Sequence, residues 1–297
     1  MAAPALQLVE MCEENEEFTD TAIQLTDDNL SQLLLQNTRK VSEFKAALLE
    51  KDAKKNWDLF YKRNETRFFK DRHWTMREFQ ELLNHHVDGQ TSQRTLFEIG
   101  CGVGNFIFPL IEEKLNFHVV ACDLSPLYSS NCIHVFQCDI TTEDVFDEVK
   151  PNSIDIGTLI FVLSAIHPDK FVSTLKRIFT LLKPGGLLLF RDYGLYDMAQ
   201  LRFKAGHKID ENFYMRQDGT RVYYFSVDYL KQLLIEAGFE ILVNCYVHRR
   251  TVNKKENIDI QSLLNGFPQD WKSSSISLYI EGEINADLSF EVSGDHN

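Results

Sequence analysis

The stretch LFEIGCGVGN, residues 96–105, predicts a β-strand that runs through a glycine-rich turn into a helix. The strand ends at Glu98, and the three glycines after it let the backbone turn tightly and pass close to a ligand. A helix that begins near Asn105 would direct its free N–H groups toward the same place. A glycine pattern alone does not identify the ligand, so the flanking sequence has to narrow the choice.

Short apolar runs alternate with helical stretches from Thr95 onward. Fully apolar strands separated by helices imply a parallel sheet with helices on both faces. The runs expected in this sheet are TLFEIG, FHVVACD, IHVFQCD, SIDIGTLIFVL and GLLLFRD. The alternating segment SISLYIEGEI, residues 275–284, supplies a final antiparallel strand. We therefore expect an α/β fold with a Rossmann-like doubly wound sheet that is mostly parallel.

The sequence divides into four parts around this sheet. Residues 1–26 form an acidic leader that we expect to be disordered. Residues 27–90 form an N-terminal helical extension, in which apolar residues from Leu30 to Leu48, behind a cap at Asp27 or Asp28, predict one long amphipathic helix. The sheet domain covers residues 91–284, with a β-hairpin insert at 193–225, and residues 285–297 form an acidic tail.

The formal net charge of −13 comes from the two ends of the chain. Residues 1–38 carry eight acidic and no basic side chains, and residues 281–297 carry five acidic and no basic ones. The body between them is neutral, and its basic end, residues 39–80, can meet an anionic partner. We find no signal peptide, membrane span or Cys/His metal spacing, which favours the cytoplasm or nucleus and no metal or membrane partner.

Two aspartates follow the glycine turn at the ends of successive predicted strands. Asp123 ends the second strand, where its carboxylate can accept hydrogen bonds from both ribose hydroxyls, and Asp139 ends the third, within reach of an adenine amino group. Each could instead cap a turn at a strand end, which is the commoner role for a single such residue. Their occurrence in series with Glu98 favours a nucleoside ligand.

The glycine spacing distinguishes between nucleoside cofactors. G-x-G-x-G, with Glu98 two residues before the first glycine, departs from the G-x-G-x-x-G of dinucleotide-binding proteins. It resembles the first motif of class I S-adenosylmethionine-dependent methyltransferases. That resemblance implies that Glu98 faces the methionine portion of the cofactor and Gly100 the sulfonium, with Gly102 in the same turn.

Longer segments resemble the methyltransferase-like family that makes 3-methylcytidine in tRNA. They are KNWDLFYKRN, FFKDRHW, GCGVGN, IFVLSAIHPDK, LKPGG, FRDYGLYDMAQLRFK, NFYMRQDGTRVYYF and TVNKKE. The resemblance covers roughly residues 53–256 and implies methylation of a cytidine at the entrance of the anticodon loop. It further implies serine tRNA as substrate, with seryl-tRNA synthetase as a helper. By position, the family's cofactor contacts fall on Trp57, Tyr61, Gly100, Asp123, Asp139, Ile140 and Ile160.

The chemistry of cytosine N3 suggests Asp192 as the catalytic residue. N3 lies on the Watson–Crick edge and carries a free lone pair, so it needs an unpaired base but no strong base catalyst. Methylation makes the ring cationic, and a carboxylate against it would stabilise the developing charge. Asp192 in FRDYG, with Arg191 and Tyr193 beside it, ends a central strand. An Arg191–Asp192 structural ion pair is the alternative.

The segment YKRNETRFFKDRHW, residues 61–74, mixes basic and aromatic side chains. One interpretation is that the aromatic side chains form an apolar stripe that packs this segment on the sheet. We expect this packing for part of the segment. The basic side chains leave a solvent-facing set suited to tRNA phosphates. This set is Lys62, Arg63, Arg67, Lys70 and Arg72.

A second basic site is expected in the insert. A two-residue turn at Asp218 and Gly219 would place Arg216 directly opposite Arg221. Like charges in that position repel unless an anion lies between them, so we interpret the pair as a phosphate clamp. An internal carboxylate partner is the alternative.

Two departures from the family pattern keep other functions open. Residues 124–134 lack the family's usual helix, and the segment after Glu256 is acidic where relatives are basic. A small-molecule methyltransferase would have no use for the basic segments. A catalytically impaired, S-adenosylmethionine-binding partner subunit would agree with the shortened 124–134 region.

Overall fold

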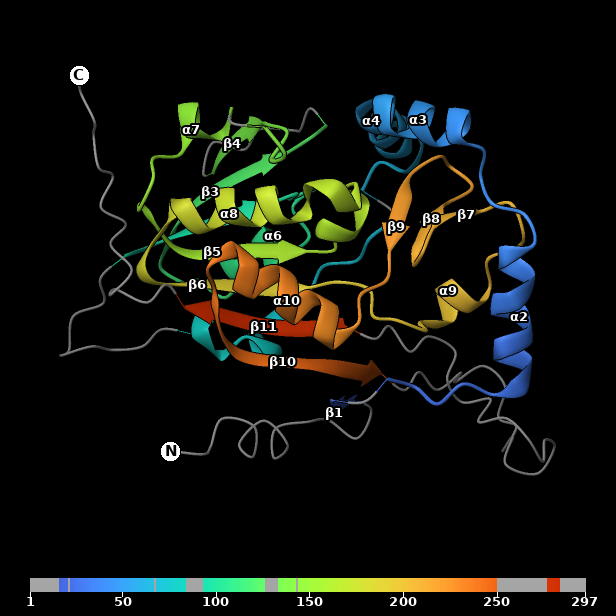
Figure 1. Cartoon of the computed structure of the whole chain (residues 1–297). Helices are drawn as coiled ribbons and strands as arrows, with labels where there is room; N and C mark the ends of the chain where they lie inside the picture. Colours follow the sequence, from blue (N-terminus) through green and yellow to red (C-terminus); the bar gives the residue numbers. More distant parts are fainter. Residues whose placement is uncertain are drawn as a thin grey trace, which may run out of the picture.

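A computed structural model describes residues 16–20, 22–66, 68–83, 93–125, 133–142, 144–249 and 277–283. An eight-stranded sheet runs through it in the order β1-β10-β11-β6-β5-β2-β3-β4 (Figure 1). Its strands are β1 (Glu16–Thr19), β2 (Arg94–Ile99), β3 (Phe117–Asp123), β4 (His134–Gln137), β5 (Ile154–Ile160), β6 (Leu182–Arg191), β10 (Glu240–Arg249) and β11 (Ser277–Glu283).

The central strands are parallel, as the sequence predicts. Strand β2 pairs in parallel with β3 and β5, and these pair in parallel with β4 and β6. Strand β11 lies between β6 and β10 and is antiparallel to both. The predicted doubly wound α/β fold with a final antiparallel strand is confirmed, and the carboxyl ends of its parallel strands share one edge of the sheet.

Helices cover both faces of this sheet (Figure 1). The described helices are α2 (Asp27–Asn37), α3 (Glu43–Lys51), α4 (Ala53–Asn64), α5 (Thr75–Glu78), α6 (Ile107–Glu112), α7 (Val145–Glu148), α8 (Phe171–Leu181), α9 (Met198–Leu201) and α10 (Val227–Ala237). Short 3-10 turns are η1 (Gln80–Leu82), η2 (Leu163–Ala165) and η3 (Pro168–Lys170).

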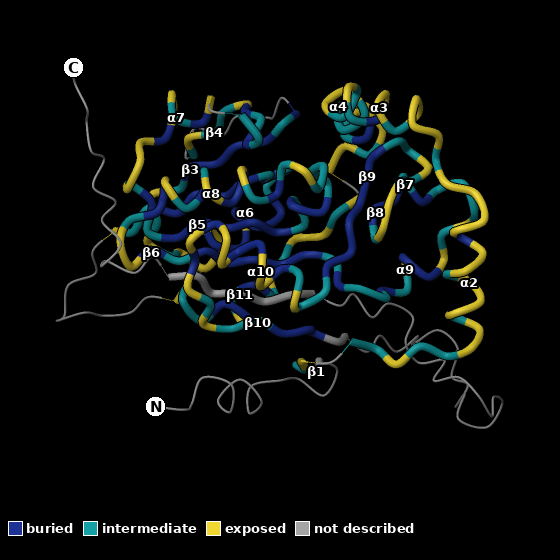
Figure 2. The backbone as a smooth tube through the Cα atoms, viewed as in Figure 1, coloured by how far each residue is buried: buried dark blue, intermediate teal, exposed yellow. Residues whose placement is uncertain are grey.

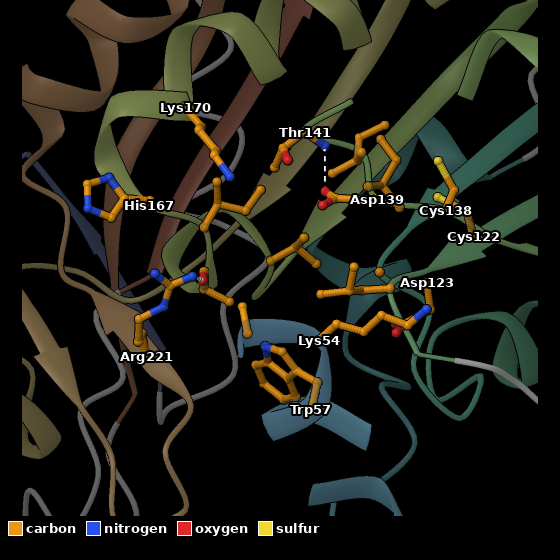
Figure 3. Close-up of a pocket in the computed structure, with 18 of the residues that line it drawn as sticks. Lys54, Trp57, Cys122, Asp123, Cys138, Asp139, Thr141, His167, Lys170 and Arg221 are labelled. Atoms are coloured by element: carbon orange, nitrogen blue, oxygen red, sulfur yellow. Dashed lines mark hydrogen bonds between the residues drawn. The ribbon is translucent and has the colours of Figure 1, made fainter. Parts of the chain in front are cut away.

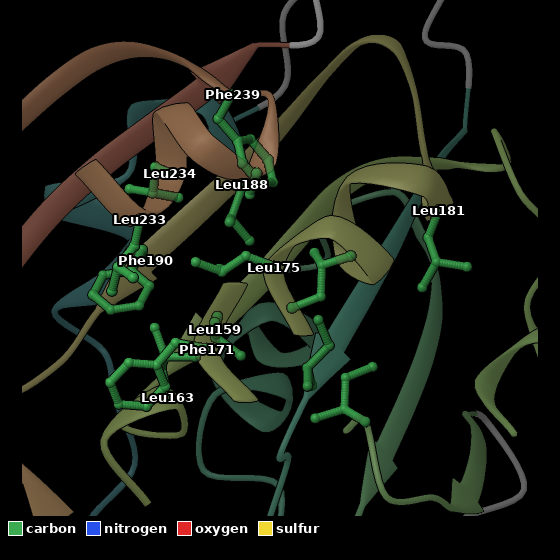
Figure 4. Packing of buried hydrophobic residues seen from close by; sticks show 14 of the residues in the cluster. Leu159, Leu163, Phe171, Leu175, Leu181, Leu188, Phe190, Leu233, Leu234 and Phe239 are labelled. Atoms are coloured by element: carbon green, nitrogen blue, oxygen red, sulfur yellow. The ribbon is translucent and has the colours of Figure 1, made fainter. Parts of the chain in front are cut away.

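The core consists of two apolar layers, one on each face of the sheet. Successive side chains of a strand point to opposite faces, so Phe97 of β2 joins one layer and Leu96 joins the other. Leu175 of α8 and Leu233 of α10 pack in the first layer (Figure 4), and Phe106 before α6 packs in the second. The central strands β2, β5 and β6 are accordingly mostly buried, whereas the edge strand β4 is not (Figure 2).

The N-terminal extension is not one long helix. Residues 38–42 separate α2 from α3, because Ser42 caps a new helix by accepting a hydrogen bond from the Lys45 N–H. The first cap is Thr26 rather than Asp27 or Asp28. The apolar stripe that suggested one helix is largely exposed: the exposed fractions of Leu34 and Phe44 are 68% and 81%.

The leader and insert also differ from expectation. Glu16–Thr19, assigned to a disordered leader, form β1 and pair antiparallel with β10, so the prediction of disorder is corrected there. The insert holds a three-stranded sheet of β7 (Lys208–Asp210), β8 (Phe213–Met215) and β9 (Arg221–Tyr223) rather than one hairpin. Residues 1–15, the tail at 285–297 and most of the shortened 124–134 region lie outside the described residues.

Candidate active site

A cavity of about 210 Å³ opens at the carboxyl edge of the parallel strands (Figure 3). The ends of β2, β3 and β4 supply one wall, with Gly100, Asp123 and Asp139. Helix α4 supplies the opposite wall with Trp57 and Tyr61. The cavity therefore brings together residues that are up to 171 positions apart in sequence, between Glu50 and Arg221.

The glycine turn requires glycine for two reasons. Gly100 has φ +71° and Gly102 φ +53°, in the left-handed region that other residues rarely adopt. A Cβ at Gly100 would overlap the Val162 side chain, and a Cβ at Gly102 would lie 2.7 Å from the Tyr61 hydroxyl oxygen. The backbone is thus left bare where α4 and the segment after β5 approach it.

Asp123 and Asp139 act as turn caps at their strand ends. The Asp123 carboxylate accepts hydrogen bonds from the N–H groups of Gly102 (2.8 Å) and Ser125 (2.9 Å). One oxygen of Asp139 accepts the N–H of Thr141 at 2.9 Å. Each carboxylate oxygen has two acceptor sites, so capping leaves acceptors for a ligand. Both proposed roles are therefore compatible.

Glu98 is buried at the end of β2 next to the guanidinium of Arg72. Burial raises the pKa of Glu98 to about 8, although the charge of Arg72 opposes the shift. Its Oε2 atom accepts no hydrogen bond from the described part of the chain. Arg72 itself donates to the Ile160 carbonyl at 3.4 Å and lies 5.5 Å from the ring centroid of Phe161. Arg72 therefore faces the interior of the site, not the solvent-facing phosphate set predicted for it.

A smaller pocket, of about 40 Å³, adjoins the cavity. Trp57, Tyr61, Gly100, Phe161 and Ala165 line both spaces. The smaller pocket continues past Ile160 and Arg72 to Ser164, Tyr193 and Arg216. It connects the glycine turn, at Gly100 and Gly102, with the segment after β6.

Asp192 lies fully buried behind the wall of this smaller pocket. Its oxygens accept hydrogen bonds from the N–H of Ser164 and the N–H of Tyr193, both at 2.9 Å. Burial raises the pKa of Asp192 to about 6, against the stabilising hydrogen bonds from Ser164. The Tyr193 ring lies 5.0 Å from that of Phe161, and Arg216 lies over Tyr193 at 5.2 Å. The buried negative charge of Asp192 is therefore separated from the pocket by the backbone of Ser164.

Arg191 does not belong to this site. It is buried on the other face of β6, where it forms an ion pair with Glu78 of α5 and lies over the Trp74 ring at 4.8 Å. Neighbouring residues of a strand point to opposite faces, so Arg191 and Asp192 cannot share a partner here. Both the catalytic role expected for Arg191 and the alternative Arg191–Asp192 ion pair are wrong.

The insert has a different register from the predicted one. Arg221 pairs with Met215, and the Arg216 N–H donates to the Thr220 carbonyl at 2.8 Å. Asp218 accepts hydrogen bonds from the Thr220 backbone and hydroxyl, and this widens the turn by one residue. Arg216 and Arg221 therefore do not face each other, and the predicted clamp is wrong.

The partner of Arg221 is Glu50 of α3. One oxygen of Glu50 pairs with Arg221, and the other accepts from the Lys170 ammonium at 2.6 Å. These hydrogen bonds lower the pKa of Glu50, outweighing its burial, which raises it. Glu50 thus joins the extension, the insert and the start of α8 at the cavity rim. No sequence pattern indicated this role, because Glu50 lies outside every motif.

The remaining basic residues lie at the end of α4. Lys62, Arg63 and Lys70 are exposed, and Arg67 lies outside the described residues. Phe60 is buried and contacts Trp57, Phe68 and Phe69. The segment therefore combines the two alternatives drawn from its sequence, a packed aromatic stripe and a basic outer face.

No group of three or more His, Cys, Asp or Glu side chains in the described residues could hold a metal ion. Among the same residues, no helix is both long and apolar enough to span a membrane.

Comparisons with known proteins agree on one class. A family model described as a methyltransferase domain matches residues 38–243. The chain is 57% identical over 229 residues to the tRNA N(3)-cytidine methyltransferase METTL6 of Mus musculus, covering 73% of this chain and 80% of that protein. It is 38% identical over 235 residues to the tRNA N(3)-methylcytidine methyltransferase trm141 of Schizosaccharomyces pombe, covering 75% and 94%. A solved 1,6-didemethyltoxoflavin-N1-methyltransferase of Burkholderia thailandensis matches with 15% identity and a TM-score of 0.48, covering 92% and 97%.

Proposed function

This chain belongs to the tRNA N(3)-cytidine methyltransferase family, and we propose that it forms 3-methylcytidine in tRNA with S-adenosylmethionine as the methyl donor. The observation that carries the proposal is the continuity of the site. The cavity bounded by Gly100, Asp123 and Asp139 leads into a pocket with Asp192 behind its wall. The methyl donor and the cytosine that receives the methyl group can thus meet in one continuous site.

The donor set fits S-adenosylmethionine. Asp123 has acceptor positions left for the two ribose hydroxyls, and Asp139 has an oxygen for the adenine amino group, with Ile140 beside it on the cavity wall. The unpartnered Oε2 of Glu98 suits the ammonium of the methionine portion. When bound, the cofactor supplies an electrophilic methyl group on its sulfonium. Trp57 and Tyr61 then close the cavity from α4.

The residues around the smaller pocket suit attack by a cytosine ring nitrogen. The N3 lone pair needs no proton removal, and transfer leaves the ring positively charged. Asp192 holds a negative charge away from water, where it stabilises that developing cation. Phe161 and Tyr193 supply aromatic surface for an unpaired base. In this proposal Asp192 acts through the pocket wall rather than by touching the base.

The exposed basic residues of α4 and of the segment after it suit the tRNA backbone. Lys62 and Arg63 lie on the outer side of the helix whose inner side carries Trp57 and Tyr61, and Lys70 is exposed in the segment that follows. Phosphates bound there would bring the anticodon loop over the pocket. The motif resemblance extends the proposal to serine tRNA as substrate and to seryl-tRNA synthetase as a helper. The cysteine pattern, with no C-x-x-C pair and no Cys/His metal spacing, extends it to the cytoplasm or nucleus as location.

The test is methylation of an unmodified serine tRNA transcript. The purified chain is incubated with S-adenosylmethionine, with and without seryl-tRNA synthetase, and the nucleosides are separated by mass. We expect 3-methylcytidine, and none from a matched transcript in which uridine replaces the cytidine at the entrance of the anticodon loop. Binding of the cofactor by calorimetry with no methylated nucleoside under either condition would contradict the proposal and favour a partner subunit.

A further inference from the structure

Two cysteines stand at the nucleoside end of the cavity (Figure 3). Cys122 comes directly before Asp123 in β3, and Cys138 comes directly before Asp139 after β4. Both side chains contribute to the cavity lining. Each thiol is therefore one residue away from a carboxylate that the proposed function assigns to the cofactor.

The sheet register brings the two thiols together. Strands β3 and β4 are parallel neighbours, with Cys122 paired to Phe136. Cys138 lies two residues beyond Phe136, so its side chain points to the same face as that of Cys122. The Cys138 N–H donates to the Asp123 carbonyl at 2.9 Å, which continues the strand pairing past the end of β4. The two side chains therefore lie next to each other at the cavity wall (Figure 3).

The proximity of the two sulfurs gives them different roles. The neighbouring Cys138 sulfur raises the pKa of Cys122, as does burial. The neighbouring Cys122 thiol lowers the pKa of Cys138. The thiolate is the reactive form of cysteine, so Cys138 is the nucleophile of the pair. Only 1% of Cys122 and 7% of Cys138 are exposed, so a reagent reaches them by way of the cavity.

We propose that Cys122 and Cys138 form an oxidant-sensitive dithiol in the cofactor cavity, which hydrogen peroxide converts into a disulfide that weakens S-adenosylmethionine binding. The Cys138 thiolate attacks peroxide, the O–O bond breaks, and the leaving hydroxide takes a proton to become water. The Cys138 sulfenic acid then reacts with the Cys122 thiol, an S–S bond forms, and the second oxygen leaves as water. Two thiols are oxidised and one peroxide is reduced.

The effect on the cofactor follows from the neighbouring residues. The two sulfurs, which are not bonded to each other in the structure, must move closer to reach a bond length of about 2.05 Å. That movement displaces the backbone of Cys138, which leads into Asp139, or that of Cys122, which leads into Asp123. Either displacement shifts a carboxylate from its position at the cavity wall. A bound adenosine would in turn cover both thiols and slow their oxidation.

The test rests on the proposed cofactor and uses the full reduced chain. Samples are treated with hydrogen peroxide, with and without S-adenosylhomocysteine. Peptide mass mapping locates any disulfide, and calorimetry measures binding of S-adenosylhomocysteine. We expect a bond between Cys122 and Cys138, an affinity at least tenfold lower, recovery with dithiothreitol, and slower bond formation when the ligand is present.

Two variants separate this site from general oxidation. Cys138→Ser, compared with its own untreated sample, should keep its affinity after peroxide, and Cys122→Ala serves if that variant fails to fold. Cys245→Ser, in β10, should stay as sensitive as the natural chain. Absence of the Cys122–Cys138 bond, or its formation with no change in affinity, would overturn the inference. A reduced chain that binds no S-adenosylhomocysteine would instead count against the proposed cofactor, and disulfide mapping remains independent of that result.

Discussion

Replacing Asp192 by Asn removes a buried charge with almost no change in shape. In the structure the carboxylate is one backbone amide away from the pocket, since Ser164 lines the pocket and donates its N–H to Asp192. For a separation of about 7 Å and an effective dielectric constant of about 20, a carboxylate and a cationic ring attract by about 2.4 kcal/mol. Loss of that attraction in the transition state predicts a kcat lower by about 50-fold.

The same substitution should leave stability nearly unchanged. Burial raises the pKa of Asp192 from 3.8 to about 6, so ionising it at pH 7 costs the fold about 3 kcal/mol. That cost is absent below pH 3.8, grows between pH 3.8 and about 6, and is constant above that. Asn removes the cost, but its amide nitrogen cannot accept one of the two backbone hydrogen bonds, a loss of about 1–3 kcal/mol. The two effects oppose each other.

The assay is single-turnover methylation of unmodified tRNA between pH 5 and pH 8, with thermal unfolding measured in parallel. Below pH about 6 the carboxylate takes up a proton, so the rate of the natural chain should rise through pH about 6 and then level off. The Asp192→Asn chain should be slow and should lack that rise. An Asn variant with an unchanged rate and the same pH profile would refute the electrostatic role of Asp192.

Three other substitutions test separate parts of the structure. Glu50→Gln should lower the free energy of unfolding by about 1–3 kcal/mol in urea, because the buried guanidinium of Arg221 loses its counter-charge; an unchanged midpoint would contradict the ion pair. Arg191→Met should cost about 3–5 kcal/mol in the same measurement, because a buried carboxylate on α5 loses the guanidinium that pairs with it, and an equally stable variant would argue against that pairing. Gly102→Ala should reduce S-adenosylhomocysteine affinity in calorimetry at least tenfold, since φ is +53° and the new Cβ meets a tyrosine hydroxyl; unaltered affinity would show that the turn has room.

The sequence predicted features that depend on the order of strands. Apolar runs fixed the parallel strands, and residues that end such strands must meet at one edge, so Asp123 and Asp139 could be brought to the same cavity from sequence alone. The alternating segment near residue 280 likewise identified the antiparallel strand β11. These inferences need only periodicity and topology.

Features that depend on the contacts of single side chains could not be predicted from the sequence. The hydrogen bonds of Asp218 to Thr220 shift the register of the insert by one residue, which moves Arg221 away from Arg216 and toward Glu50. The sequence also did not reveal that Arg191 and Asp192 have different surroundings. The two residues are adjacent at the end of the same apolar run, but their side chains point to opposite faces of the sheet. An apolar stripe in the extension suggested burial that the structure does not give it.

The central claim is that one continuous site holds the methyl donor and the cytosine that receives the methyl group. It is tested most directly by an experimental structure of the chain with S-adenosylhomocysteine and a serine tRNA anticodon arm. We expect adenosine against Asp123 and Asp139, and an unpaired cytosine between Phe161 and Tyr193 with its N3 directed at the cofactor sulfur. A target base bound on another face of the molecule, or adenosine bound away from the two aspartates, would contradict it.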